Sequence, residues 1–299
     1  MNFSYVPTLS SQSEHNRSPT TVNSALEMYP GLQGLGSRVP LSLRVWAVQQ
    51  AVYHAFSLIF QFCDETGAMR CFKARNADRK SYAGLLLRVL FNQCFVLLPS
   101  MILVEYWGLC FTGQSSQVFW KQYLMAPLIM TVGHDVVQYF THRHLLHQPN
   151  GKLTRALGHS VHHTTGATKA ISACYMSAPD FFLEIVLPYL VPLAIVGGGG
   201  RNTLFHSLVA GLGAIGGLYE HSGYDFSGIF RKKISDSTAV SLLTNFLSSF
   251  LDNRSHTEHH VRGTVSFSDG FGSPGICDTI FGTRWDLVAI RRGNTVKKE

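Results

Sequence analysis

The chain has 299 residues, of which 45% are hydrophobic, 12% are aromatic and only 14% are charged, whereas about 25% is typical of soluble domains. The mean hydropathy of +0.09 is only mildly positive, which favours several membrane segments together with a sizeable polar domain. The net charge is +7, but the basic residues lie beside apolar segments and do not form one run interleaved with aromatics, which argues against nucleic-acid binding.

The two ends of the chain differ in composition from its middle. Residues 1–40 are rich in Ser, Thr, Pro and Asn and show neither apolar periodicity nor a secretory signal peptide, so we expect a disordered N-terminal tail. We expect a basic C-terminal tail over 287–299, and one membrane-embedded domain over 41–286. The six cysteines are scattered without a CxxC pair, which indicates reduced structural thiols.

Five apolar segments approach the length of about 20 residues that a helix needs to cross a bilayer; they are 43–62, 84–111, 119–141, 180–200 and 203–220. The expected fold is therefore all-α, a multi-pass membrane helical bundle with a cytosolic histidine-rich helical cap. The run Gly197–Gly200 indicates a tight turn, so the last two segments should form a helical hairpin, and 84–111 should pair with 119–141 as a second one. A buried core helix is the alternative for each segment.

Positive charge predicts the orientation of the chain. Basic residues follow both the third segment and the last hairpin, which places both histidine-bearing regions in the cytosol; they are Arg143, Lys152, Arg155 and Lys169, then Arg231, Lys232, Lys233, Arg254 and Arg262. The segment 43–62 is then either a fifth span with a lumenal N-terminus or a helix along the cytosolic surface. A glycan on the sequon at Asn16 would support the fifth span.

The most informative feature is the grouping of the 14 histidines. An HxxHH pattern should occur by chance about 0.03 times in this composition, so two copies are a strong signal. The groups are HRHLLH (His142 to His147), HSVHH (His159, His162, His163) and HTEHH (His256, His259, His260).

Helical spacing explains what such groups can do. Residues three or four apart share a helix face, so each HxxHH box can aim its imidazoles at one metal or at two adjacent metals. Neighbouring histidines differ by about 100° of rotation, which suits two metals better than one. His142 and His147 are five apart, so they either straddle the helix and bind different metals, or the helix distorts locally in a π-bulge.

Residues around the first box are candidates for outer roles. We expect His134 and His144 to be core residues or to support the ligands. Asp135 lies two helical turns before His142, where its carboxylate can accept the distal N–H of a liganding histidine and fix its tautomer.

Three alternative roles for the histidines are disfavoured. An exposed pH-responsive cluster would not need three boxes on one side of a membrane. A structural zinc site saturates with about four ligands, usually including Cys, and these boxes contain none. A metal transporter would carry polar residues within its spans, whereas these histidines follow the helix ends.

The pattern resembles the sterol desaturase and fatty acid hydroxylase superfamily, in which an HxxxH or HxxxxH box is followed by two HxxHH boxes. The likeness runs from about residue 85 to 286 and includes the lead-in DVVQYFTHR. EHSGYDF (Glu220–Phe226) resembles a family element that contributes a further liganding histidine, here His221, although Ser227 stands where Pro is usual.

The C-terminal part of the likeness is DTIFGT (Asp278–Thr283), which resembles the closing motif of the family. Cys277 stands where Trp is usual, and Ser268–Gly270 replaces a more typical Asn-Tyr-Gly. The six-residue first box resembles the fatty acid 2-hydroxylase branch and HSGYDF the methylsterol oxidase branch, so the substrate stays open.

The resemblance implies a monooxygenase of lipid biosynthesis in the endoplasmic reticulum membrane. It would bind two Fe ions, or Zn in recombinant material, and use O2 with electrons from NAD(P)H, delivered by a reductase or cytochrome b5 docking on the basic cytosolic face. The product would be a hydroxylated fatty acid, sterol, sphingolipid, terpenoid or polyketide intermediate; a desaturase, or a non-redox metal-dependent enzyme, is the alternative. No catalytic residue is expected beyond the metal ligands, which are His142, His147, His159, His162, His163, His221, His256, His259 and His260.

Overall fold

In the computed structural model of the chain, helices joined by short loops account for most of the described residues. These residues are 39–76, 79–112, 120–148, 151–231, 238–268, 270, 273 and 275–288. Within them there is no β-strand, only two isolated bridges, so the all-α prediction is confirmed. The predicted N-terminal and C-terminal tails lie outside the described residues, except for Val39, Pro40, Leu287 and Val288.

All five apolar segments form helices, two of them interrupted by a π-helical turn. They are α2 (Leu41–Thr66); α3 (Tyr82–Asn92), η3 (Gln93–Leu97) and α4 (Leu98–Tyr106); α5 (Trp120–Thr141); α8 (Ala178–Phe181), η6 (Phe182–Val186) and α9 (Leu187–Ile195); and α10 (Thr203–Glu220).

Two continuous helices are long and apolar enough to cross a membrane, among the residues that the structure describes. One runs over Tyr82–Tyr106 with a mean hydropathy of 1.8, and the other over Ala178–Ile195 with a mean hydropathy of 1.6. Large apolar side chains on the first of them are open to the surroundings, since Leu87 is 80% and Phe95 is 69% exposed. Such exposure is costly in water and ordinary in lipid.

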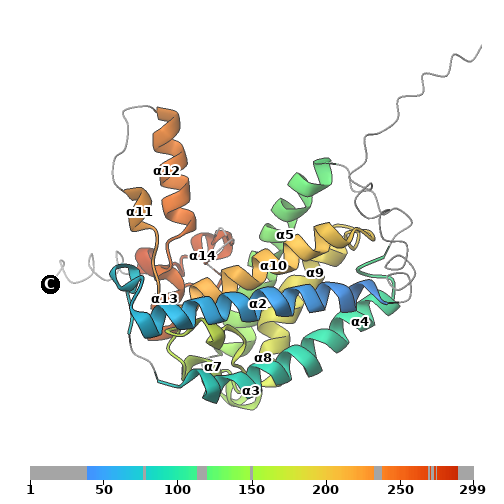
Figure 1. The fold of residues 1–299 in the computed structure, drawn as a ribbon, viewed down its shortest axis with the longest axis horizontal. Helices are drawn as coiled ribbons and strands as arrows, with labels where there is room; N and C mark the ends of the chain where they lie inside the picture. The colour runs from blue at the N-terminus through green and yellow to red at the C-terminus, as the bar shows by residue number, and fades with distance from the viewer. Residues whose placement is uncertain are drawn as a thin grey trace, which may run out of the picture. The chain divides into compact units, whose positions relative to one another are not determined.

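The long helices pack on partners distant in sequence. Helix α10 lies along α2, which also contacts α4, while α9 packs against α5 (Figure 1). Gly133 allows the close approach of α5 and α9, because a Cβ at this position would lie 2.8 Å from Cβ of Pro192. A larger residue at position 133 would therefore push the two helices apart.

The hairpins predicted from the sequence are only partly correct. Gly197–Gly200 form the expected turn, with φ between 66° and 81°, a region that glycine adopts without strain. The helices on either side, however, pack on α5 and α2 and make few contacts with one another, and α4 likewise packs mainly on α2. The turn contacts the loop after α4 instead, since the N–H of Phe111 donates to the carbonyl of Gly198 at 2.9 Å.

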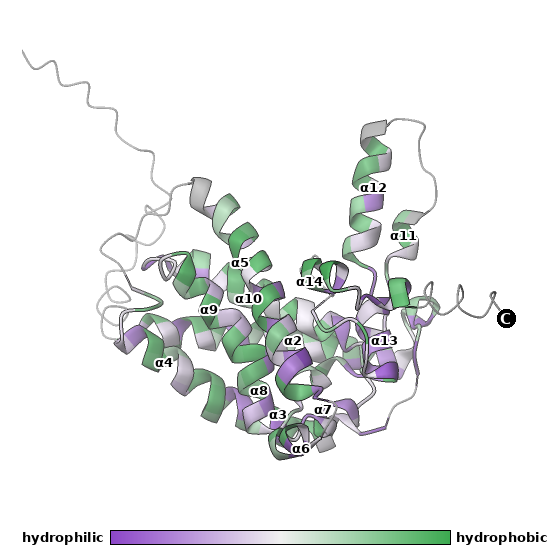
Figure 2. Ribbon diagram, turned by 180° about the vertical axis from the view of Figure 1, so that it is seen from behind, coloured by the Kyte–Doolittle hydropathy of each residue, from purple (hydrophilic) through white to green (hydrophobic). Residues whose placement is uncertain are grey.

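Most of the remaining helices are short, and η4, α7 and α13 among them carry residues of the histidine boxes. Helix α13 is distinctly hydrophilic, in contrast to the predominantly apolar α5, α9 and α10 (Figure 2). The remaining elements are η2 (Arg70–Phe72), η4 (His142–Leu146), α6 (Lys152–Leu157), α7 (Ser160–His163), η5 (Ala170–Cys174), α11 (Gly228–Arg231), α12 (Thr238–Phe250), α13 (Arg254–Arg262) and α14 (Ile276–Ile280).

Candidate metal centre

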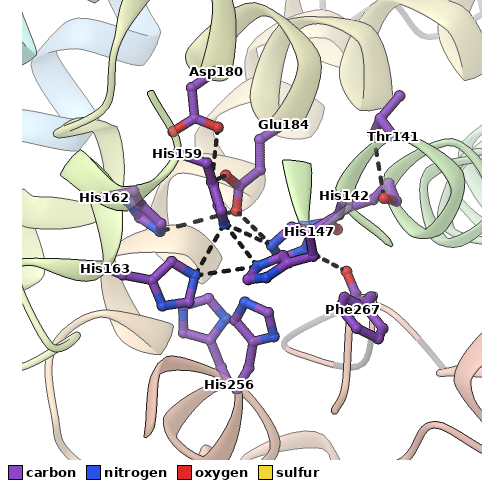
Figure 3. Close-up of polar contacts among 12 residues, drawn as sticks. Thr141, His142, His147, His159, His162, His163, Asp180, Glu184, His256 and Phe267 are labelled. Atoms are coloured by element: carbon purple, nitrogen blue, oxygen red, sulfur yellow. Dashed lines mark hydrogen bonds and ion pairs between the residues drawn. The ribbon is translucent and has the colours of Figure 1, made fainter. Parts of the chain in front are cut away.

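The structure brings all nine predicted histidines together in two adjacent groups. Within each group the nitrogens that could bind an ion lie within 4.8 Å of one another. The first group contains His142, His147, His159, His163 and His259, and the second contains His162, His221, His256 and His260. The side chains of His142, His147, His159 and His163 point toward one another in Figure 3. We call these sets the first and second histidine groups.

The first box uses a local distortion of the helix. The N–H of His147 donates to the carbonyl of His142 at 2.9 Å, which closes a five-residue π-helical turn, η4. The two rings therefore lie on the same side with centroids 4.9 Å apart, and both belong to the first group. Of the two alternatives for this pair, the π-bulge is confirmed, and the interpretation that the pair straddles the helix is wrong.

The two HxxHH boxes divide their histidines between the groups in opposite ways. In HSVHH, His159 and His163 are four apart and face the first group, while His162 faces the second. In HTEHH, the two histidines that are four apart face the second group, and His259 faces the first. The inference that neighbouring histidines serve different points is therefore confirmed, and the groups are interleaved through the same two segments.

Separations between nitrogens within a group match those around a single ion. In the first group, Nε2 of His159 lies 2.9 Å from Nε2 of both His147 and His163. In the second group, Nε2 of His221 lies 3.1 Å from that of His162 and 3.0 Å from that of His256. Two nitrogens bound at right angles to one ion at about 2.1 Å are about 3.0 Å apart.

The outer nitrogens of several rings are held by acceptors. A carbonyl or carboxylate oxygen can only accept, so the ring hydrogen sits on Nδ1 and the Nε2 lone pair faces inward. The pairs are His142 with the carbonyl of Phe267 (2.7 Å), His259 with that of Val265 (2.8 Å), His221 with that of Gly217 (2.9 Å), and His159 with Oδ1 of Asp180 (2.9 Å).

Converging lone pairs are the clearest sign of a cation site. Nε2 of His142 lies 3.2 Å from Nε2 of His159, yet neither nitrogen has a hydrogen to donate. Nε2 of His259 is buried and has no hydrogen-bond partner among the described residues. Such an arrangement is unfavourable unless a cation accepts these lone pairs, so the first group fits a metal ion. The second group fits one as well, because Nε2 of His221 faces inward, 3.1 Å from Nε2 of His162 and 3.0 Å from Nε2 of His256.

Burial keeps the rings in the neutral form that metal binding needs. Desolvation, reinforced by neighbouring histidines, lowers the pKa of His147 to about 2 and that of His163 to about 3. Desolvation also lowers the pKa of His221 to about 4. Protons therefore compete weakly with a metal ion at neutral pH.

Asp135 does not contact a histidine ring, so the role predicted for it needs correction. Its carboxylate accepts the N–H groups of Ile276 and Cys277, both at 2.9 Å, and the hydroxyl of Ser273 at 3.0 Å. The first-turn N–H groups of α14 have no partner within that helix, and Asp135 satisfies them. It thus fastens α14 to α5, while Phe267 takes the outer nitrogen of His142.

His144 and His134, the two other histidines near the first box, belong to neither group. His144 is exposed, and its ring stacks on that of Phe140 with centroids 5.7 Å apart. Its ring contacts are with Tyr139 and Phe140, and among the described residues it holds no ligand ring, so the supporting role predicted for it is not borne out. His134 also lies outside both groups.

The closing motif of the sequence holds the loop that orients two ligands. Asp278 accepts the N–H groups of Phe267 (3.0 Å) and Ser268 (2.7 Å) and the hydroxyl of Thr283 (2.5 Å). The same loop presents the carbonyls that accept from His142 and His259. Asp278 and Thr283 of DTIFGT therefore affect the first group indirectly, because they hold the backbone loop whose carbonyls orient His142 and His259.

The HSGYDF element is fastened to α2 and α13, which fixes the end of α10 that carries His221. The hydroxyl of Tyr224 donates to Asp64 at 2.8 Å, and the Lys73 ammonium donates to the carbonyl of Ser222 at 2.8 Å. The side-chain amide of Asn253 donates to the carbonyl of Tyr224 at 3.0 Å.

Two acidic residues at the site were missed from the sequence. Asp180 and Glu184 are buried, with 0% and 2% of their surface exposed, and they form a third possible metal-binding set together with His159. The sequence does contain a signal for them, since two carboxylates lie four residues apart at the start of an apolar segment. Burying carboxylates there costs free energy, and such residues are usually functional.

Comparison with known proteins agrees with this geometry. The model of the fatty acid hydroxylase family matches residues 127–283, which is just over half of the chain. The chain belongs to the fatty acid hydroxylase family. This family is part of the sterol desaturase and fatty acid hydroxylase superfamily, as the motifs predict. No match is found among curated proteins or among solved structures.

Family membership gives the histidines a chemical context. A fatty acid hydroxylase is an oxygenase that acts on a hydrophobic lipid, and the matched range begins in α5 and ends with the closing motif at Thr283. The family and the two apolar helices together indicate a membrane protein.

Proposed function

We propose that this fatty acid hydroxylase family member hydroxylates a lipid or related hydrophobic substrate through two iron ions, one in each histidine group. The observation that carries the proposal is the convergence of nine imidazoles in two interleaved groups, in which outer acceptors leave Nε2 of His142, His159, His259 and His221 facing inward with a lone pair. Imidazole suits iron, zinc and copper alike, so the choice of iron rests on the family.

When bound, the two irons supply the reducing equivalents and Lewis acidity that O2 activation requires. Overall, one C–H bond, O2, two electrons and two protons give an alcohol and water. The electrons would come from NAD(P)H through a reductase or cytochrome b5. Desaturation is the alternative outcome on the same scaffold, in which both oxygen atoms leave as water.

The residues of the chain orient the ligands and exclude water. Backbone carbonyls of Val265 and Phe267 and the carboxylate of Asp180 hold three rings of the first group with Nε2 inward. Burial of the rings keeps bulk water from a strong oxidant. A site beside apolar helices would admit substrate from the lipid.

The proposed location is the endoplasmic reticulum membrane, with several spans and the histidine groups facing the cytosol. The two apolar helices support membrane insertion, and the basic residues after the third and fifth apolar segments support the orientation. A basic cytosolic face would also attract an acidic electron-transfer partner.

The test is expression in microsomes with isotopically labelled O2, followed by untargeted lipid analysis of wild type, His162→Ala and the matched control His144→Ala. We expect a product carrying one labelled oxygen in wild type and in the control, and its loss in His162→Ala. An alkene without label would assign desaturation. An unchanged product profile in His162→Ala would overturn the role given to the second group.

A further inference from the structure

The segment that begins the fourth apolar region carries two buried carboxylates against the histidine groups. Asp180 lies in α8 and Glu184 in the π-helical turn η6, four residues later, so both project from one side of this segment. Figure 3 shows both side chains directed toward the histidine rings. The hydroxyl of Ser177 accepts the N–H of Asp180 at 3.3 Å and fixes the start of the segment.

The two acids both approach His159 but differ in their other contacts. Asp180 accepts a hydrogen bond from Nδ1 of His159 at 2.9 Å and thereby positions that ring, while Oε2 of Glu184 lies 3.5 Å from the same nitrogen. Oε1 of Glu184 reaches between the groups, because it lies 3.9 Å from Nε2 of His142 and also 3.9 Å from Nε2 of His162. One of these nitrogens belongs to the first group and the other to the second.

These separations are those of atoms that share an ion. Two atoms bound to one ion at about 2.1 Å lie between about 3.0 Å apart at a right angle and about 4.2 Å apart when opposite. The distances from Oε1 of Glu184 to His142 and to His162 both fall in this range. A single carboxylate is thus within reach of an ion in either group.

Charge balance gives a second reason. Nine neutral imidazoles contribute no negative charge, whereas two divalent cations would bring four positive charges into a buried region. Only 2% of Glu184 is exposed, and its neighbours among the described residues include the carboxyl of Asp180 and, 3.5 Å from Oε2, Nδ1 of His159. A buried carboxylate beside another carboxyl is costly, and a nearby pair of cations would reduce that cost.

We propose that Glu184 is a carboxylate ligand shared by the two metal ions, so that nine histidines and one bridging carboxylate hold the centre. This inference rests on the proposed function, because it requires an ion in each group. Asp180 is a positioning residue for His159 and is not itself a ligand.

The test compares the purified full-length wild type with Glu184→Gln, which keeps the size of the side chain and removes its charge. Glu65→Gln is the matched control, since Glu65 is exposed on α2. Each protein is loaded with isotopically enriched Fe, and metal content, Mössbauer spectra and retention against a competing chelator are measured.

In wild type and the control we expect two irons per chain. In Glu184→Gln, both iron sites should change their Mössbauer parameters, and the affinity for both ions should fall at least about tenfold. Unchanged spectra and affinity, or a change confined to one site, would overturn the proposal that Glu184 is a ligand of both ions.

Two further observations keep the test decisive. Wild type that binds fewer than two irons would contradict the proposed function itself, which separates that failure from a failure of Glu184 alone. If Glu184→Gln does not accumulate, Glu184→Asp serves instead: it keeps a carboxylate but shortens its reach, so altered spectra at both sites support the bridge and wild-type spectra overturn it.

Discussion

Replacing Asp278 by Asn should weaken the first histidine group without touching a histidine. The carboxylate of Asp278 accepts from the N–H groups of Phe267 and Ser268 and from the hydroxyls of Ser268 and Thr283. An amide has one acceptor oxygen, so about two of these charge-assisted bonds are lost, each worth about 1.5–3 kcal/mol. The free energy of unfolding of the metal-stripped protein should fall by about 3 kcal/mol or more.

The same change should lower metal affinity in one group only. The loop released in Asp278→Asn carries the carbonyls of Phe267 and Val265, which orient His142 and His259. Loss of such outer partners typically costs 10- to 100-fold in metal affinity. The second group should be spared, since the outer nitrogen of His221 is held within its own helix.

The assays are denaturant unfolding of the stripped protein in detergent and chelator competition on the loaded protein. Asp286→Asn is the control, because Asp286 pairs with Arg284 at the surface. Unchanged affinity in Asp278→Asn, or a loss confined to the second group, would refute the reasoning.

Three further predictions follow from individual contacts. In the metal-stripped protein the pKa values of His163 and His221 are lowered to about 3 and about 4, while the unfolded value is about 6.5. The unfolded chain therefore takes up protons first, so stability present above pH 6.5 is lost toward pH 4, by about 3 kcal/mol from His221 alone; a melting temperature that stays constant over this range would contradict this. Lys73→Met leaves the largely buried carboxylate of Asp64 without its cation and should cost about 3 kcal/mol in denaturant unfolding, whereas wild-type stability would show that the pair of Lys73 with Asp64 does not stabilise the fold. His144→Ala should keep the full metal content by elemental analysis, because His144 is exposed; loss of an ion would show that it is a ligand.

The histidine groups could be predicted because their spacing obeys helix geometry. Residues four apart, such as His159 and His163, must share a face, and the neighbouring His162 must point about 100° away. The sequence could not choose between a regular helix and a π-bulge for His142 and His147, because the choice depends on the backbone hydrogen bond from one to the other.

The partners of the ligands were harder to predict. Carbonyls of Val265 and Phe267 carry no side-chain signature, since any residue offers the same backbone acceptor. A histidine ring was the wrong partner for Asp135, because the spacing of residues along α5 does not predict contacts with α14. The carboxylate of Asp135 instead accepts the N–H of Ile276 in α14, 141 residues further along the chain.

The pairing of the helices could not be predicted from local sequence either. The glycine turn at Gly197–Gly200 was recognised, yet a turn fixes only the backbone at that point. The choice of α5 as the partner of α9 depends on contacts such as Gly133 against Pro192, which are distant in sequence.

The presence of a metal ion in each histidine group is tested most directly by locating iron in the protein. Anomalous diffraction at the iron edge from crystals of the iron-loaded chain should give two peaks, one among the nitrogens of the first group and one among those of the second. A single peak, or iron bound away from both groups, would contradict the account.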